Sequence, residues 1–171
     1  MFLTVFVLVG ALLGFRLLGA LGVRRFASWP VSAAHGMAVL LLVTASAHFV
    51  PAGSPLPMPG HADMVAMVPP FVPFPSFVVY LTGVLELLGA AGLVLARTRR
   101  PAGYALALLF VAMFPANVHA ALAEVPLGGD EATPLWFRTP EQVLFIAVAL
   151  WATRGSDRML LSVRRRQPVA S

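Results

Sequence analysis

Long, uninterrupted apolar segments constrain this chain more than any other feature of its sequence. Residues 80–96, YLTGVLELLGAAGLVLA, contain one charged side chain, Glu86, and apolar runs of similar length recur along the chain. Charged residues make up only 11% of the 171 residues, whereas soluble domains carry about 25%. Because a helix needs about 20 apolar residues to cross a bilayer, the sequence predicts an all-α membrane protein.

Five apolar segments are expected to cross the membrane. The last has only 14 residues, so it is expected to begin earlier, near residues 135–137, or to lie in a thinned bilayer. The prediction is a four-helix transmembrane bundle within residues 31–154, one additional N-terminal transmembrane helix within 1–25, and a basic cytoplasmic tail at 155–171. The five segments are residues 2–22, 31–50, 76–96, 102–123 and 140–153.

Arginine residues predict the orientation of these segments. Cytoplasmic loops of membrane proteins carry an excess of basic residues. Basic residues follow the first, third and fifth segments, whereas residues 51–75 contain none and residues 124–138 contain only Arg138. The sequence therefore predicts a multi-pass membrane protein, with its N-terminus outside and its C-terminus in the cytoplasm.

The composition also excludes several kinds of chemistry. The chain has no cysteine, which excludes disulfide exchange, thiolate metal sites and iron–sulfur clusters. No established metal-binding or nucleotide-binding motif is present, so no metal and no covalent cofactor are expected. The arginines lie at the ends of apolar segments, which favours the lipid bilayer over nucleic acid as the partner of this basic chain.

Three polar residues lie deep within the expected helices and are the first candidates for a ligand site. Glu86 lies near the middle of the third segment, and a carboxylate in hydrocarbon is costly unless it has a proton or a partner. His48 and Asn117 lie nearer the outer ends of the second and fourth segments. Because helical side chains lean toward the N-terminus, these three could converge if their helices face one another. Tyr80 adds a polar group above Glu86.

Further candidates lie around this expected outer pocket. Pro115 should kink the fourth segment and free the carbonyl of Val111, and His119 follows one turn later. The last segment opens with RTPEQ, in which Thr139 is expected to cap the helix and Glu141 to complement its dipole. That capping leaves Arg138 and Gln142, which are expected to face the same pocket.

The loop at 51–75 holds eight prolines and one helix-like stretch, HADMVAMVP, at 61–69. An apolar face on that stretch predicts a short helix lying on the membrane surface. The alternative is a lid over a pocket that opens outward.

Several short motifs together resemble the DoxX-like family of small bacterial membrane proteins. The resemblance covers about residues 35–154 and implies a four-helix membrane bundle, from which the additional N-terminal segment departs. The family is associated with a subunit of a thiosulfate:quinone oxidoreductase and with redox partners. The motifs are His48-Phe49, MVPPFVP, YLTGVLEL, FPAN and LWFRTPEQ, in which Arg138, Pro140 and Gln142 match the family pattern and Glu141 is a local variation.

With this resemblance, the leading hypothesis is a protein of the bacterial plasma (inner) membrane whose outward-facing intramembrane pocket binds a quinone-like ligand as a component of a membrane redox system. Glu86 would donate or relay a proton, with His48 as its partner. Two alternatives stay open, a non-catalytic membrane anchor or scaffold for a redox partner and a small proton-coupled transporter. Enzymatic activity, a soluble or membrane redox partner and a homo-oligomer are left open by the sequence.

Overall fold

The computed structural model describes residues 2–51, 54 and 58–155, and over these residues the chain is all-helical. The described part has six α-helices and no strand, which confirms the all-α prediction. Two short 3₁₀ turns, η1 (Arg24–Phe26) and η2 (Thr153–Gly155), complete it. The helices are α1 (Leu3–Ala20), α2 (Trp29–Ala47), α3 (His61–Met67), α4 (Pro75–Val94), α5 (Arg99–Leu122) and α6 (Leu135–Ala152).

Four of the described helices, α1, α2, α4 and α5, are long and apolar enough to cross a membrane. Helix α6 has the same 18-residue length as α1, but its first half carries Arg138, Glu141 and Gln142, which lower its mean hydropathy. It begins at Leu135, as one of the two sequence alternatives expected. The predicted cap at Thr139 is wrong, because Pro134 occupies the N-cap position and Thr139 lies inside the helix.

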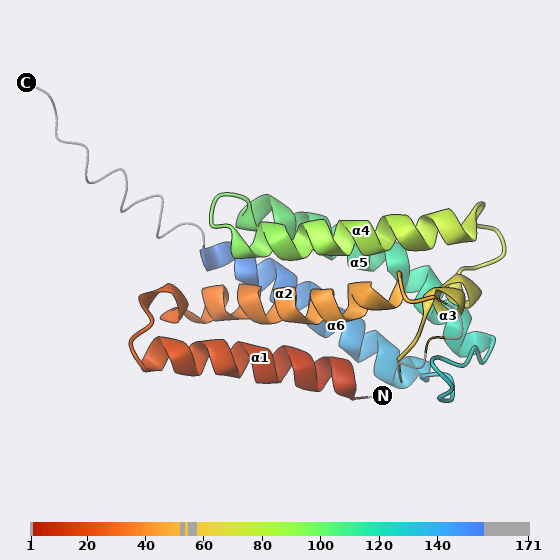
Figure 1. Cartoon of the computed structure of the whole chain (residues 1–171), viewed down its shortest axis with the longest axis horizontal. Helices are drawn as coiled ribbons and strands as arrows, with labels where there is room; N and C mark the ends of the chain where they lie inside the picture. The colour runs from red at the N-terminus through yellow and green to blue at the C-terminus, as the bar shows by residue number, and fades with distance from the viewer. Residues whose placement is uncertain (1, 52–53, 55–57, 156–171) are drawn as a thin grey trace, which may run out of the picture.

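Helices α2, α4, α5 and α6 close into a four-helix bundle (Figure 1). Helix α2 packs against both α4 and α6, and α5 packs against the other sides of the same two helices. Helix α1 lies outside this ring and packs mainly on α2, so Leu8 is its one fully buried side chain. The bundle interior is filled by aliphatic and aromatic side chains, among them Met37, Leu41, Leu93, Leu106 and Phe145.

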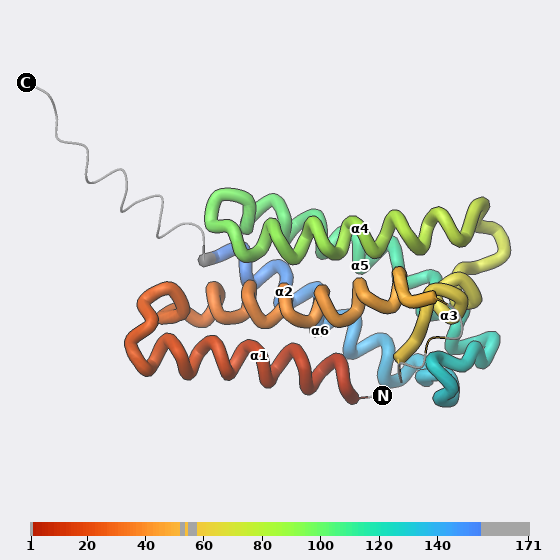
Figure 2. Tube along the Cα trace, viewed as in Figure 1, coloured from red at the N-terminus to blue at the C-terminus, as the bar shows by residue number. Residues whose placement is uncertain are grey.

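Successive long helices run in opposite directions, which gives the bundle two chemically different ends (Figure 2). One end, here called the basic end, holds the α1–α2 turn, the α4–α5 turn and η2. It carries Arg24, Arg25, Arg97, Arg99, Arg100 and Arg154. The other end, here called the loop end, holds α3 and the α5–α6 connection. The predicted basic tail falls on residues 155–171, and beyond Gly155 it lies outside the described residues.

Candidate functional site

Glu86 of α4 and His48, the C-cap residue that follows α2, form a buried pair between these two helices. Nε2 of His48 lies 3.6 Å from Oε1 of Glu86. Glu86 is 3% exposed and His48 is 5% exposed, so both side chains are shielded from the surroundings of the bundle. Gly83 makes this approach possible, because a Cβ atom there would lie 2.6 Å from Cβ of His48. The structure thus brings together two of the three residues that the sequence singled out.

The imidazole of His48 is fixed by hydrogen bonds on its other nitrogen. Nδ1 donates to the carbonyl oxygen of Val79 over 2.7 Å, and the hydroxyl of Thr82 lies 3.3 Å from the same nitrogen. Because a carbonyl oxygen can only accept, the hydrogen bond to Val79 places a proton on Nδ1. Nε2 is therefore the nitrogen that gains or loses a proton opposite Glu86.

The second carboxyl oxygen of Glu86 also has a partner. The hydroxyl of Thr44 in α2 donates to Oε2 of Glu86 over 2.7 Å. Both oxygens of this carboxyl group therefore face polar atoms of α2, although the surrounding helix surfaces are apolar. Such an arrangement lowers the cost of holding an ionisable group inside an apolar bundle.

A second histidine, His61 at the start of α3, covers the loop-end side of this pair. Its Nδ1 donates to the carbonyl oxygen of His48 over 2.8 Å, and its Nε2 lies 2.8 Å from the hydroxyl of Ser76. Its ring stacks on Tyr80, with the ring centroids 4.0 Å apart. The sequence predicted a helix in this stretch correctly but assigned His61 no role, because only the fold shows that its neighbours are His48 and Tyr80.

Three of the other predicted site residues form a second polar group between α5 and α6, namely Asn117, Arg138 and Gln142. Nδ2 of Asn117 donates to Oε1 of Gln142 over 3.2 Å, and Nη1 of Arg138 lies 3.5 Å from Oδ1 of Asn117. Among its described hydrogen bonds, Asn117 has none to Glu86 or His48. The expected three-way convergence is therefore replaced by a Glu86–His48 pair and a separate Asn117–Gln142–Arg138 group, because Asn117 faces α6.

The helix around Pro115 and the side chain of His119, both expected near the ligand pocket, have structural roles in the fold. Helix α5 continues through Pro115, and the amide of Gln142 donates to the carbonyl oxygen of Phe110, one residue before the predicted Val111. Nδ1 of His119 donates to the carbonyl oxygen of Met67 over 3.1 Å, which ties α3 to the end of α5. His119 therefore positions the surface helix over the loop end.

No group of three or more potential metal-binding side chains occurs within the described ranges of the chain. Glu86 and His48 form a pair. The other hydrogen-bond partners of their side chains are the hydroxyls of Thr44 and Thr82 and the backbone carbonyl of Val79. Hydroxyls, a carboxyl and an imidazole of this kind bind and transfer protons.

Comparison with known proteins gives one match. A family model described as "Domain of unknown function (DUF8561)" matches residues 37–153. This range includes the Glu86–His48 pair, His61 and the Asn117–Gln142–Arg138 group, and it leaves out α1. No curated protein and no solved structure matches the chain.

Proposed function

Because the chain belongs to the DUF8561 family, which is described only as a domain of unknown function, we propose its function from its buried polar residues. We propose an integral membrane protein that binds a quinone-like ligand at its outer side, next to the Glu86–His48 pair, as a component of a membrane redox system. The observation that carries this proposal is the pair itself, a carboxyl and an imidazole 3.6 Å apart inside an apolar bundle.

The chemistry of a quinone suits such a pair. Reduction of a quinone to a hydroquinone takes up two electrons and two protons, and the electrons would come from a redox partner protein. An imidazole and a carboxyl that face each other can hold and deliver a proton where water is scarce. Ionisable residues inside membrane bundles usually belong to such proton or substrate pathways.

The proposal includes a specific topology in the bacterial inner membrane. Helices α1, α2, α4, α5 and α6 would each cross the bilayer, with the N-terminus outside and the basic end in the cytoplasm. The clustering of arginines at the basic end supports this orientation. The four-helix bundle of α2, α4, α5 and α6 also suits the proposed kinship with DoxX-like proteins, for which a four-helix membrane bundle is expected. A solved DoxX-like structure with a different architecture would contradict that kinship.

The topology predicts which introduced cysteines a membrane-impermeant maleimide can label. The natural chain has no cysteine, so each single replacement is the only target. In spheroplasts, Glu131→Cys in the α5–α6 connection should be labelled, and Val23→Cys in the α1–α2 turn should be labelled only after permeabilisation. The reverse pattern would invert the topology, and labelling of both would show that the five-span arrangement is wrong.

Replacing Glu86 by glutamine should weaken quinone binding while preserving the fold. Glutamine has nearly the same shape and can still accept the hydrogen bond from Thr44, but it cannot supply a carboxyl proton. We expect the affinity for a decyl-tailed quinone to fall about tenfold, which corresponds to about 1.4 kcal/mol. Calorimetric titration in mild detergent measures this change, with Glu131→Gln as the matched surface control. Equal affinities in the natural chain and Glu86→Gln would refute the proposed role.

A further inference from the structure

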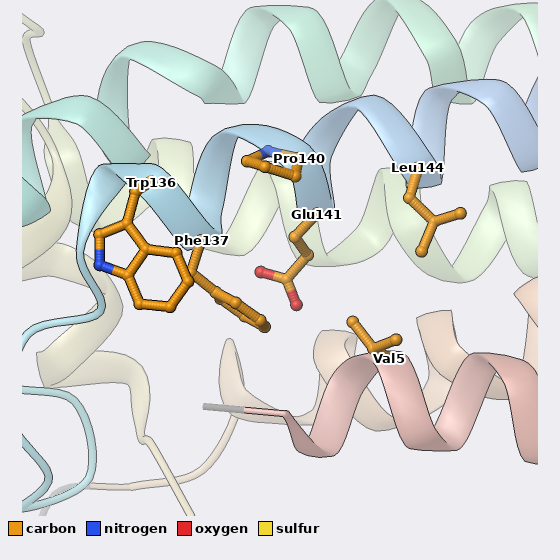
Figure 3. A pocket seen from close by; sticks show the side chains of 6 residues that line it. All are labelled: Val5, Trp136, Phe137, Pro140, Glu141 and Leu144. Carbon is orange, nitrogen blue, oxygen red and sulfur yellow. The ribbon is translucent and has the colours of Figure 1, made fainter.

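A groove lies between the beginning of α1 and the first half of α6, and it shares no lining residue with the Glu86–His48 pair (Figure 3). Its volume is about 340 Å³, within the range of small-molecule sites. Helix α1 supplies one wall through Val5, and α6 supplies the other. The lining residues are Val5, Trp136, Phe137, Pro140, Glu141 and Leu144.

Glu141 is the only ionisable residue among the six that line this groove. Its carboxyl group points from α6 toward α1 (Figure 3), and the side chain is 8% exposed. Oε1 accepts a hydrogen bond from the hydroxyl of Thr4 in α1. A buried carboxyl group at the base of an otherwise apolar groove suits a ligand with an apolar body and one polar head.

The contacts around the groove explain why α1 and α6 do not close it. The ring of Phe2 meets the ring of Phe137 edge to face, with centroids 4.9 Å apart, and this contact lies at the beginning of α1. The Thr4–Glu141 hydrogen bond joins the same two helices beside it. Farther along, α1 packs on α2 rather than on α6, so an apolar space remains next to Glu141.

We propose that this groove binds a membrane-soluble amphiphile whose apolar ring or chain contacts Trp136 and Leu144 and whose hydroxyl donates a hydrogen bond to Glu141. The hydroxyl is required because the carboxyl group offers an acceptor at the base of the groove, while the walls offer only apolar contact. Helix α1 lies outside residues 37–153, the range that the family model matches. One wall of this groove is therefore not part of the matched family domain.

Trp136 allows a direct test, because it lines the groove and the chain has only three tryptophans. Replacing Trp29 and Trp151 by phenylalanine leaves Trp136 as the sole reporter of ligand contact. The probes are 3-bromo-5-decylphenol and its methyl ether, since bromine quenches tryptophan on contact, the bromine is on the ring proposed to contact Trp136, and only the phenol donates a hydrogen bond. We expect the phenol to quench Trp136 at about tenfold lower concentration than the ether, a ratio of the size that one hydrogen bond gives.

Three variants of this reporter protein test the roles of Glu141, of the groove itself and of the Glu86–His48 pair in binding the probes. Glu141→Leu should abolish the preference for the phenol, and Leu144→Phe, which narrows the groove without adding a second tryptophan, should weaken the binding of both probes. Glu86→Gln should keep the preference, so that a failure at the Glu86–His48 pair is distinguishable from a failure here. Equal quenching by the two probes in the unaltered groove, or a preference that survives in Glu141→Leu, would overturn the proposal. If Glu141→Leu does not fold, unchanged phenol binding in Leu144→Phe would overturn the proposal.

Discussion

Replacing Gly83 by alanine should lower the free energy of unfolding by about 1–3 kcal/mol, the usual cost of overpacking a tight contact. The added Cβ would lie 2.6 Å from Cβ and 2.9 Å from Cγ of His48. Helix α2 would have to move away from α4 at the level of the Glu86–His48 pair. Alanine otherwise stabilises a helix by about 1 kcal/mol relative to glycine, so a net loss reports the clash itself.

Gly10 of α1 provides the matched control for this substitution. A Cβ at Gly10 would meet nothing within 4 Å, so Gly10→Ala should leave stability unchanged or raise it. Thermal unfolding in the same detergent measures both variants against the natural chain. Equal unfolding midpoints for Gly83→Ala and Gly10→Ala would show that α2 and α4 are not in the close contact described here.

Replacing Glu86 by leucine should also destabilise the bundle, by about 1–3 kcal/mol, the penalty for leaving buried polar groups without partners. Nε2 of His48 and the hydroxyl of Thr44 would both lose the carboxyl group that they now face. The glutamine variant should cost less, because its amide oxygen can still accept from Thr44. Detergent-denaturation curves of the two variants measure the difference.

A double-mutant cycle with His48→Leu separates the pair from its surroundings. The double variant should be more stable than the sum of the two single losses implies, with a coupling of about 1 kcal/mol, as for polar contacts between membrane helices. Strictly additive losses would mean that Glu86 and His48 do not interact. The cycle reports the contact independently of any ligand.

The lengths of the apolar segments and the charged residues at their ends predicted the helices well, because the length of an apolar segment determines where a membrane helix can form. The segment predicted at residues 76–96 corresponds to α4, and the helix-like stretch at 61–69 corresponds to α3. The depth of His48 and Glu86 in their segments was enough to single them out. Their burial then follows from Gly83 of α4, where the absence of a Cβ atom lets His48 approach.

The neighbours of each polar residue could not be predicted, since a sequence gives the depth of a residue but not the direction in which its helix faces. Asn117 lay at a depth that suited Glu86, yet α5 turns it toward Gln142 of α6. Glu141 was interpreted as a dipole partner at a helix start, but the helix begins six residues earlier and Glu141 faces α1. Both differences arise from helix rotation and packing, which only the assembled bundle determines.

The central claim is that the Glu86–His48 pair serves a bound ligand. Native mass spectrometry of the protein, extracted in mild detergent, measures most directly what remains bound. We expect a retained molecule with the mass of a quinone, which is lost in Glu86→Gln and kept in Glu131→Gln. A bare chain, or a chain that carries only a partner protein, would contradict the claim and would make Glu86 a structural residue of a membrane anchor.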